Sequence, residues 1–384
     1  MKDQRSRKIK VLFLIHDLGQ GGAEKVLVNL VNNMDQSKFD ISVTALFGGG
    51  VNEQYLKKEI HYRAVWNKQI PGNSKFMKLL SPSQLHKLCV KEEYDIEISY
   101  LEGPSARVIS GCRNSNTKLV SWIHVEQHTM KKLAQSFRSK QEAIDCYERF
   151  DQTVCVSEFV REDFCSILSF NKPCIVLHNT VESQKILEQM QGEAIGLFSD
   201  GKFRLIAVGT LKKSKGYDRL FRIVKKLSSE GYPVHLYVLG TGPEQQNLET
   251  YIKNNSLQQF ITLLGYQTNP YQYVRKCDLF VCASYAEGFS TATTEALIVE
   301  TPVCTVEVSG MKEMLGKNNE YGIVTENNEK ALYQGIKSLL DNPELLKHYR
   351  KKATERGKKF MTENTVRSVE IMLLELRGCC YEIN

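Results

Sequence analysis

Short apolar runs alternate with amphipathic stretches along the whole chain. In the first half, near-continuous apolar runs are separated by longer stretches in which apolar residues recur at helical spacing. Buried strands that alternate with helices are typical of a parallel sheet covered by helices on both faces. The expected strands are Ile9–His16, Ile41–Phe47, Tyr62–Trp66, Ile96–Tyr100, Leu119–His124, Gln152–Val156 and Cys174–Leu177. The expected helices are Ala23–Met34, Phe76–Val90, Lys131–Tyr147 and Glu158–Leu168.

The alternation stops at a polar segment, Val181–Lys202, and then begins again. We expect this segment, which ends in Ser199-Asp200-Gly201, to be a linker between two domains. The strands expected beyond it are Phe203–Val208, Val234–Leu239, Phe260–Leu264, Leu279–Ala283, Val303–Val306 and Gly322–Val324. The helices expected there are Tyr217–Leu227, Glu244–Asn254, Asn269–Cys277, Thr291–Val299 and Glu329–Leu340, followed by Asn342–Lys359 and Glu363–Leu376.

The pattern predicts an α/β protein of two doubly wound, Rossmann-like domains that face each other across a cleft. A chain of 384 residues is too long for one hydrophobic core, which agrees with two domains. We expect an N-terminal domain over residues 1–185, a C-terminal domain over 186–362 and a final helix within 363–384. In such folds, ligands bind beyond the carboxyl ends of the strands.

Composition narrows the class of protein. Hydrophobic residues make up 42% and charged residues 25%, as in ordinary soluble globular proteins. No apolar run is long enough to span a membrane, and the run Val11–Ile15 after the basic N-terminus is too short for a signal peptide. The 11 cysteines are scattered, without a CxxC pair or the His/Cys spacing of a zinc site. We therefore expect a cytoplasmic protein with reduced thiols and without a bound metal.

The net charge of +7 leaves three interpretations of the basic runs: a solvated surface, an anionic membrane surface or nucleic acid. Nucleic acid ranks last, because the chain has no zinc finger, RNA-binding sheet motif or basic zipper. The stretch 131–147 is either a plain surface helix or a helix that lies on anionic lipid. Its basic residues are Lys131, Lys132, Arg138 and Lys140, and its apolar residues include Leu133, Phe137 and Ile144.

Glu287 and Glu295 are the strongest candidates for chemistry. They lie in a segment that follows a strand-like run, Asp278–Ala283, and opens a helix-like run that begins at Thr291. If the segment is helical, the eight residues from one to the other rise about 12 Å. A glycosidase acid/base pair needs a separation of roughly 5–9.5 Å, so the two carboxylates would not act on one bond. They suit two hydroxyl-rich parts of one long ligand, such as the sugar and the ribose of a nucleotide sugar.

A loop with three lysines, Lys212, Lys213 and Lys215, follows the expected strand Phe203–Val208. Lys215 precedes Gly216, just before an expected helix. Fixed cations and helix N-terminal amides stabilise the negative charge that a diphosphate leaving group gains as its bond to a sugar breaks. Alone, the loop is typical of a solvated basic turn. Together with the two glutamates, it favours phosphate binding.

Two glycine turns and one histidine complete the candidates. The turn that contains Gly21 and Gly22 follows the first strand, and either binds an anion or is a tight turn without a ligand. Glu24 stands where the dinucleotide fingerprint has its third glycine, which disfavours NAD. The turn around Gly242 is either structural or the nucleotide side of the cleft. His124 ends an expected strand, and no serine or cysteine nucleophile motif accompanies it.

These motifs resemble glycosyltransferase family 4, the retaining transferases of the GT-B fold, and in particular those of bacterial envelope and capsule polysaccharide synthesis. The resemblance covers nearly the whole chain. In one departure, the family often has arginine where Thr210 stands. The matching segments are Gly21-Gly22-Ala23-Glu24, Val208-Gly209-x-Leu211-x-x-x-Lys215-Gly216, Leu239-Gly240-x-Gly242-Pro243-Glu244 and Glu287-Gly288-Phe289 leading to Glu295-Ala296, the family's Glu-x7-Glu.

The resemblance implies roles for the matched residues. Glu295 would bind the donor's ribose, Glu287 would bind sugar hydroxyls with help from backbone amides over 288–291, and Lys215 would bind the diphosphate. The last helix would cross back onto the N-terminal domain. The implied catalytic residues are Glu287, His124 and Lys215, and the implied donor-binding residues are Gly21, Gly22, Thr210, Lys212, Lys215, Gly242, Gly288, Phe289, Ser290, Thr291 and Glu295.

The residues and the resemblance together imply a metal-independent, cofactor-free retaining hexosyltransferase that would be cytoplasmic or peripheral on the inner face of the plasma membrane. It would move a sugar from a nucleotide sugar to a lipid-linked or polysaccharide acceptor of the bacterial envelope. Two alternatives stay open: a GT-B-fold sugar-nucleotide epimerase, and a non-catalytic nucleotide-sugar-binding subunit, which Thr210 suggests. An NAD oxidoreductase is a more distant alternative.

Overall fold

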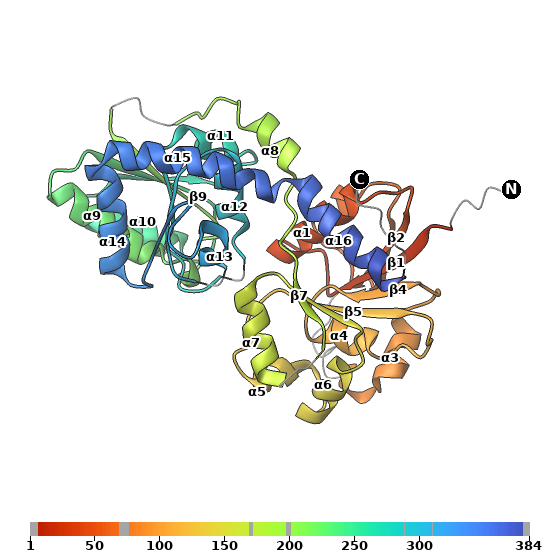
Figure 1. Ribbon diagram of the computed structural model, residues 1–384. Coiled ribbons are helices and arrows are strands. Elements are labelled where there is room, and N and C mark those ends of the chain that lie inside the picture. Colours follow the sequence, from red (N-terminus) through yellow and green to blue (C-terminus); the bar gives the residue numbers. More distant parts are fainter. Residues whose placement is uncertain are drawn as a thin grey trace, which may run out of the picture. The chain divides into compact units, whose positions relative to one another are not determined.

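The computed structural model describes residues 7–68, 77–168, 172–196, 201–287, 289–308 and 310–378. The chain forms two compact units (Figure 1). The N-terminal unit comprises Met1–Thr180 with Thr362–Asn384, and the C-terminal unit comprises Val181–Met361. The sequence placed these divisions after residues 185 and 362. Each unit is built around one parallel β-sheet.

The N-terminal unit contains a seven-stranded sheet in the order β3-β2-β1-β4-β5-β6-β7. Val11 of β1 lies opposite Ile41 of β2 on one side and opposite Ile96 of β4 on the other. The strand order reverses between β1 and β4, and ligand crevices of doubly wound sheets form at such switch points. The strands are β1 (Ile9–Ile15), β2 (Phe39–Phe47), β3 (His61–Trp66), β4 (Ile96–Ser99), β5 (Lys118–Ile123), β6 (Gln152–Cys155) and β7 (Cys174–Val176).

Local capping signals set several helix ends in this unit. Ser81 accepts a hydrogen bond from the Gln84 amide, and Pro82 occupies the first turn, so α3 begins there. Near the end of the chain, Glu370 of α16 accepts a hydrogen bond from the amide of Asp35 at 2.6 Å, just beyond α1. The helices are α1 (Gly22–Asn33), α3 (Pro82–Cys89), α4 (Pro104–Ile109), α5 (Met130–Leu133), α6 (Lys140–Tyr147), α7 (Glu158–Leu168) and α16 (Thr362–Leu376), with the 3-10 turns η1 (Glu53–Tyr55) and η2 (Ala134–Ser136).

The C-terminal unit contains a six-stranded parallel sheet in the order β10-β9-β8-β11-β12-β13, with its switch point between β8 and β11. The strands are β8 (Phe203–Val208), β9 (Val234–Leu239), β10 (Ile261–Gly265), β11 (Leu279–Cys282), β12 (Val303–Val306) and β13 (Ile323–Thr325). The helices are α8 (Ser183–Gln189), α9 (Tyr217–Ser229), α10 (Gln245–Asn254), α11 (Tyr271–Lys276), α12 (Thr291–Ile298), α13 (Met311–Leu315), α14 (Glu329–Asp341) and α15 (Pro343–Gly357), with the turns η3 (Lys213–Lys215) and η4 (Lys358–Phe360).

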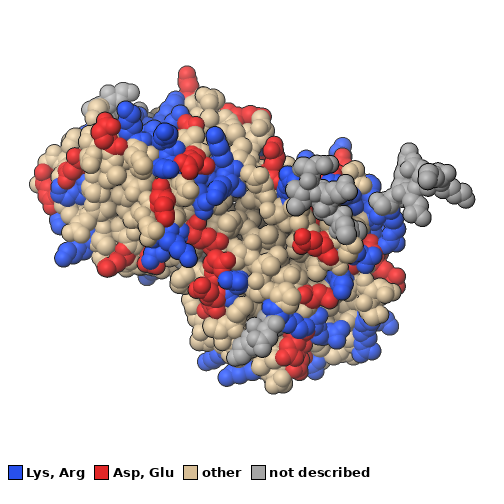
Figure 2. All heavy atoms as spheres, in the orientation of Figure 1, with Lys and Arg blue, Asp and Glu red and all other residues tan. Residues whose placement is uncertain are grey.

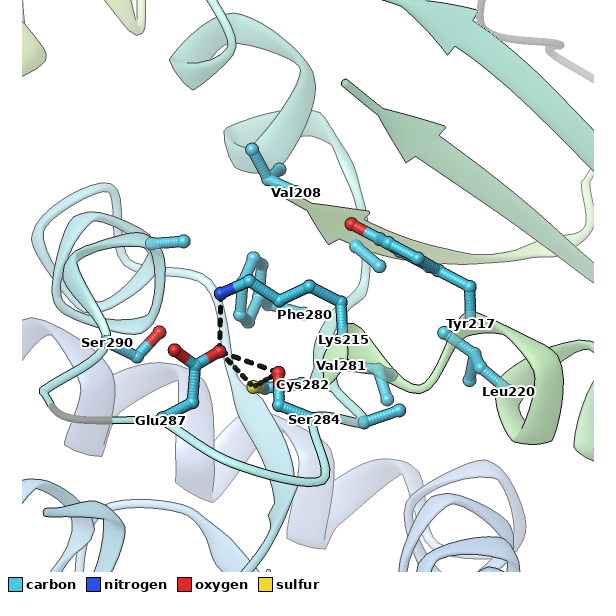
Figure 3. Close-up of a pocket in the computed structure, with 13 residues that line it drawn as sticks. Val208, Lys215, Tyr217, Leu220, Phe280, Val281, Cys282, Ser284, Glu287 and Ser290 are labelled. Carbon is cyan, nitrogen blue, oxygen red and sulfur yellow. Dashed lines mark hydrogen bonds and ion pairs between the residues drawn. The ribbon is translucent and has the colours of Figure 1, made fainter. Parts of the chain in front are cut away.

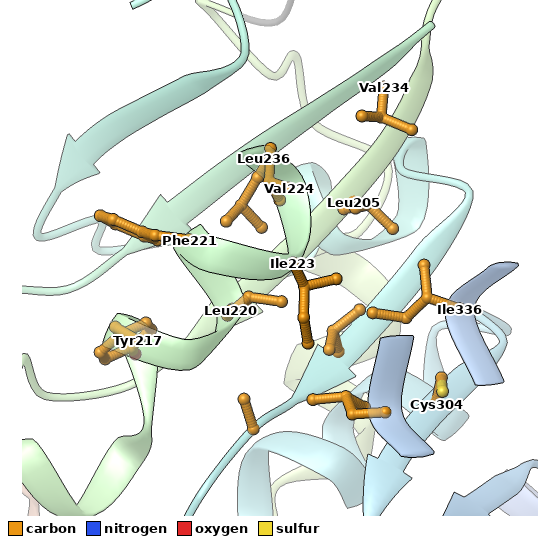
Figure 4. Packing of buried hydrophobic residues seen from close by; sticks show 14 of the residues in the cluster. Leu205, Tyr217, Leu220, Phe221, Ile223, Val224, Val234, Leu236, Cys304 and Ile336 are labelled. Carbon is orange, nitrogen blue, oxygen red and sulfur yellow. The ribbon is translucent and has the colours of Figure 1, made fainter. Parts of the chain in front are cut away.

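Helix α9 shows how the amphipathic pattern builds the core of this unit. Leu220, Ile223 and Val224 recur at helical spacing, and their side chains are buried against strand residues such as Leu205 and Leu236 (Figure 4). Each fully buried aliphatic side chain of this kind stabilises the fold by roughly 1.5–3 kcal/mol. The packed helix therefore holds the loop before it, which contains Lys215, against the end of the sheet.

All of the expected strands are present, with nearly the expected ends. Three expectations were wrong. The expected linker contains α8, which buries Ile186 and contacts α11 and α12, although Ser199 and Asp200 lie outside the described residues. The helix expected over 131–147 is divided into α5, η2 and α6, because Ser139 caps a new helix. The helix expected from Phe76, a residue outside those described, is interrupted before Ser81.

Charged side chains cover both units. Figure 2 shows Lys and Arg side chains interspersed with Asp and Glu over the face in view, rather than gathered by sign. Among the described residues, no helix has both the length and the apolar character that are needed to cross a membrane.

Candidate functional site

The candidate site lies at the switch point of the C-terminal unit. A pocket opens where β8 and β11 end, and its walls include Val208 of β8 and Cys282 of β11. Lys215 enters from the loop after β8, while Glu287 and Ser290 enter from the loop after β11 (Figure 3). Residues that are far apart in the sequence therefore converge at the sheet edge where doubly wound folds bind ligands.

Gly216 explains how Lys215 reaches this pocket. The φ angle of Gly216 is +65°, and a Cβ atom at this position would lie 1.9 Å from the carbonyl oxygen of Ala283. A side chain here would be strained by the positive φ angle and would clash with this carbonyl oxygen, so glycine is required. The loop backbone can therefore pack directly against the end of β11, which brings Lys215 beside the loop that follows this strand.

Lys215 and Glu287 contact each other in the pocket. Lys215 Nζ donates a hydrogen bond to Glu287 Oε1 at 2.6 Å, and the same oxygen accepts a hydrogen bond from Ser284 Oγ at 2.6 Å. Cys282 Sγ lies 4.0 Å from this oxygen, and burial, with a further contribution from Glu287, raises the pKa of the Cys282 thiol. The pocket thus combines an ammonium group that suits an anion with a carboxylate that suits hydroxyl groups.

Arg219 holds the loop after β11 in place, and the sequence reasoning missed it. Its side chain is 2% exposed. Its Nε and one terminal nitrogen donate hydrogen bonds to the carbonyl oxygens of Ala283 and Ser284, each at 2.7 Å. The guanidinium carbon also lies 4.2 Å from the ring centroid of Tyr285. A signal was present in the sequence, because Arg219 stands in the apolar stripe of α9, four residues before the buried Ile223.

Replacement of Arg219 by methionine is expected to lower the free energy of unfolding by about 2–4 kcal/mol, because two carbonyl groups would lose their charged donor. The loop that carries Glu287 would also lose its anchor, so binding of the expected nucleotide-sugar donor should weaken. The matched control is Arg222→Met on the same helix, since Arg222 forms exposed ion pairs worth about 0–1 kcal/mol. Urea denaturation and donor titration of both variants measure these effects, and equal losses would contradict the proposed anchoring.

Helix α12 begins just after this loop. The side chain of Ser290 accepts a hydrogen bond from the amide of Thr293 and caps the helix, which starts at Thr291. The helix starts at the expected residue, Thr291, and Glu287 lies in the preceding loop. The rise of about 12 Å that a helical segment would give between Glu287 and Glu295 therefore does not apply. Glu295 lies within α12, where Tyr271 donates a hydrogen bond to its Oε1 at 3.4 Å.

Two further residues of this segment, Phe289 and Gly288, were also predicted to bind the donor. The Phe289 side chain is buried and packs against Phe360, with ring centroids 6.0 Å apart, so it offers only its backbone to a ligand. Gly288 lies outside the described residues.

The two turns after β8 and β9 pack against each other. The amide of Leu211 donates to the carbonyl oxygen of Thr241 at 3.0 Å, and a Cβ atom on Gly242 would lie 2.6 Å from the carbonyl oxygen of Leu211. This close approach explains why glycine is required at position 242, without any role in ligand binding. Thr210 and Lys212 are exposed, and within the described part of the chain they are not among the residues that line the pocket.

In the N-terminal unit, His124 directly follows β5 and is 6% exposed. It lies beside Tyr100, with ring centroids 4.9 Å apart, and its Nε2 has no hydrogen-bond partner among the described residues. The amide of His124 donates to Glu102 Oε2 at 3.1 Å, a contact that the sequence reasoning missed. Burial lowers the pKa of His124 to about 3, so the ring is neutral at pH 7. A buried, neutral nitrogen without a partner is suited to a ligand hydroxyl.

The lowered pKa of His124 makes the free energy of unfolding depend on pH. In the unfolded chain the imidazole takes up a proton near pH 6.5, whereas the folded protein keeps it neutral down to about pH 3. The unfolded state binds more protons in this window, so stability should fall as the pH falls from 6.5 towards 3, by about 1.4 kcal/mol per pH unit. His124→Gln should lose this part of the slope, and His61→Gln at an exposed position should keep it. Urea denaturation from pH 7.5 to 5 tests this, and identical slopes for the three proteins would contradict it.

The turn with Gly21 and Gly22 precedes and opens α1, and both glycines are exposed. A Cβ atom on Gly21 would lie 1.9 Å from Glu24 Oε2, so this carboxylate covers the turn. Burial raises the pKa of Glu24. Asp17 accepts a hydrogen bond from the amide of Gly19 at 2.7 Å. One amide of the turn is therefore engaged by an acidic side chain, and Glu24 would need to share or leave its place if an anion bound there.

Comparison with known proteins covers nearly all of this chain. Residues 20–185 match the family model Glycosyltransferase Family 4, and residues 192–356 match Glycosyl transferases group 1. The chain is 30% identical over 362 residues to the N-acetylgalactosamine-N,N'-diacetylbacillosaminyl-diphospho-undecaprenol 4-alpha-N-acetylgalactosaminyltransferase of Campylobacter jejuni, which spans 91% of this chain and 95% of that protein. It is 22% identical over 366 residues to a GalNAc-alpha-(1->4)-GalNAc-alpha-(1->3)-diNAcBac-PP-undecaprenol alpha-1,4-N-acetyl-D-galactosaminyltransferase of the same organism, with 92% and 94% coverage.

The fold is also shared with solved structures. Anabaena Alr3699/HepE in complex with UDP has a TM-score of 0.76 and 18% sequence identity, and covers 96% of this chain and 100% of that chain. The prediction of a two-domain α/β GT-B fold is thereby confirmed. Because one relative is 30% identical along almost its whole length, and the two family models together span both units, the chain belongs to the family 4 glycosyltransferases.

Proposed function

We propose that this glycosyltransferase moves a sugar from a nucleotide-sugar donor to a lipid-linked acceptor in the synthesis of an envelope glycan. The observation that carries the proposal is the contact between Lys215 and Glu287 at the switch point of the C-terminal unit. The acceptor class is supported by the C. jejuni relatives, whose names specify diphospho-undecaprenol and PP-undecaprenol carriers. The donor class is supported by the complexes of Alr3699/HepE with UDP and with UDP-glucose.

Lys215 is proposed to bind the diphosphate. Its ammonium group is held between the end of the sheet and the loop after β11, so it is in place before negative charge develops on the leaving group. Glu287 balances this charge through its contact with Lys215. When a donor binds, the diphosphate balances the charge of Lys215 in place of Glu287. Glu287 can then accept hydrogen bonds from sugar hydroxyls, while Ser284 Oγ keeps its hydrogen bond to Glu287 Oε1.

The remaining roles are proposed from the resemblance to the family and are supported by the contacts of each residue. Glu295 is proposed to bind the ribose, with Tyr271 orienting its carboxylate. Amides at the start of α12 are proposed to bind the phosphates, since a helix N-terminus favours anions. His124 is proposed to bind a sugar hydroxyl through Nε2, whose lack of a partner among the described residues supports the role.

The reaction is proposed to retain the configuration of the sugar and to need no metal ion. In the retaining step, the leaving phosphate oxygen would take the proton of the acceptor hydroxyl on the same face of the sugar as the new bond forms. The fixed charge of Lys215 and the α12 amides would supply the electrostatic stabilisation that the departing diphosphate needs. Full activity in the presence of a strong chelator would support metal independence, and loss that Mg²⁺ restores would contradict it.

A panel of UDP, GDP, ADP and their sugars tests the donor. Ligand at 100 times its dissociation constant should raise the free energy of unfolding by about 2.7 kcal/mol. UDP-N-acetylgalactosamine is the first donor to test with a diphospho-undecaprenol-linked saccharide, because the name of one relative specifies N-acetylgalactosaminyl transfer to such an acceptor and a structural neighbour binds UDP. A new glycosidic bond supports the proposal. Conversion of the donor without acceptor would indicate an epimerase, and binding without any turnover would indicate a non-catalytic subunit.

Peripheral attachment to an anionic membrane is proposed as a purely electrostatic contact. Lys131, Lys132, Arg138 and Lys140 are exposed, whereas Leu133 and Phe137 are buried within the unit, so these two apolar side chains are not available to enter lipid. A variant with the four basic residues changed to glutamine should sediment less with liposomes that contain anionic lipid. The matched control changes Lys347, Lys351, Lys358 and Lys359, which are also exposed. Equal sedimentation of both variants would contradict the contact.

A further inference from the structure

Glu97 is a buried carboxylate in the N-terminal unit, away from the residues discussed above. It is the second residue of β4, and its side chain is 2% exposed. A position near the start of a strand is opposite to the carboxyl edge where the sheet would bind a ligand. Carboxylates are rarely buried unless they are paired or coordinate a metal ion, so the partners of this side chain decide its role.

Two potential metal ligands surround Glu97. His86 Nε2 lies 2.7 Å from Glu97 Oε2, and Cys112 Sγ lies 3.8 Å from Glu97 Oε1. The three ligand atoms all lie within 4.8 Å of one another. Tetrahedral Zn²⁺ sites place their nitrogen, oxygen and sulfur ligands roughly 3.3–3.8 Å apart. Small side-chain adjustments would therefore bring the three atoms to the spacing of a zinc site.

The charges around the cluster also suit a cation. Among the residues that the structure describes, no lysine or arginine forms an ion pair with Glu97. Arg149 approaches the cluster but donates its hydrogen bond to the carbonyl oxygen of Cys112 at 2.6 Å, which fixes the backbone beside the thiol. A carboxylate and a thiolate together balance a divalent ion, so the buried site would be neutral when it is loaded.

We propose that His86, Glu97 and Cys112 bind one divalent transition-metal ion, Zn²⁺ in particular. The mixed nitrogen, oxygen and sulfur donors match its preference. Cys112 is 3% exposed and His86 is 17% exposed, so the side of the cluster at His86 is open to water, which supplies the fourth ligand. On binding, the Cys112 thiol releases its proton to solvent.

The proposed ion joins three separate elements. His86 lies on α3, Glu97 on β4, and Cys112 in the turn after α4. A metal at their meeting point would stabilise the N-terminal unit without taking part in sugar transfer. The ligands are spread over separate elements, so the sequence lacks the short His/Cys spacing that marks common zinc sites.

Titration of the full-length reduced protein with Zn²⁺ or Co²⁺, after treatment with a chelator, tests the proposal. Cys379 and Cys380 are replaced by serine in every protein, so that these adjacent thiols do not contribute. We expect one ion per chain, a higher melting temperature with Zn²⁺, and with Co²⁺ the visible bands of a tetrahedral site together with a thiolate charge-transfer band. Cys112→Ser should remove the charge-transfer band, and His86→Gln should weaken Zn²⁺ binding at least about tenfold.

Cys89→Ser is the matched control, because Cys89 is also a buried cysteine of this unit but is not part of the cluster. It should keep the charge-transfer band. Circular dichroism checks that each variant folds. If Cys112→Ser does not fold, His86→Gln still tests the proposal. Absence of saturable binding, or a charge-transfer band that persists in Cys112→Ser, would overturn the proposal and leave a His86–Glu97 ion pair with a nearby thiol.

Discussion

Replacement of Lys215 by methionine is expected to lower kcat by roughly 10²–10³-fold, the loss typical of removing one preorganised group that stabilises developing negative charge. Methionine keeps most of the side-chain volume but lacks the ammonium group. The effect should exceed that on donor binding, because the charge on the leaving diphosphate is greater in the transition state than in the bound donor. Steady-state transfer kinetics with donor and acceptor varied separately measure kcat and KM.

Lys213→Met is the matched control for this prediction. Lys213 lies in the same short turn, carries the same charge and is exposed, and it does not line the described pocket. Its removal should change kcat less than about threefold, as expected for a solvated charge. Combining Lys215→Met with Glu287→Gln should cost less than the sum of the two single changes, because the two side chains contact each other. Equal losses for Lys215→Met and Lys213→Met would refute the special role of Lys215.

Replacement of Gly216 by alanine is expected to destabilise the C-terminal unit by roughly 2–4 kcal/mol, which combines left-handed backbone strain with a steric clash. The added Cβ atom would lie 1.9 Å from the carbonyl oxygen of Ala283, so the two loops would have to separate. Lys215 would move away from Glu287, and turnover should fall even in the fraction of the protein that folds.

Gly231→Ala separates the two causes. Gly231 lies in the same unit and also has a positive φ, +87°, but a Cβ atom there would meet nothing within 4 Å. This variant should lose only about 1 kcal/mol and should keep its activity. Urea denaturation and kcat of both variants measure the difference. A loss of stability in Gly216→Ala no greater than that in Gly231→Ala would show that the contact with Ala283 does not constrain the loop.

Local signals in the chain were enough to predict most of the fold. Strands such as Phe203–Val208 are short apolar runs with polar boundaries, and helix α9 carries its apolar residues at helical spacing, so both patterns can be recognised without knowledge of their partners. Lys215 and Glu287 could be selected because each stands in a loop beside an expected helix. What failed was local as well: α8 was taken for a linker, because a short helix with few apolar residues becomes stable only when Ile186 packs onto the rest of its unit.

The sequence by itself thus determined the order of strands and helices and the loops in which chemistry resides, because periodicity and turn chemistry act between near neighbours. Only the tertiary structure decided which distant groups meet. It placed Lys215 against Glu287 and the carbonyl group of Ala283 so close to Gly216 that no side chain fits there. It buried His124, whose Nε2 has no hydrogen-bond partner among the described residues. It also gathered His86, Glu97 and Cys112, which no spacing rule connects. These contacts depend on how sheet and helices pack, and packing is decided by the whole chain at once.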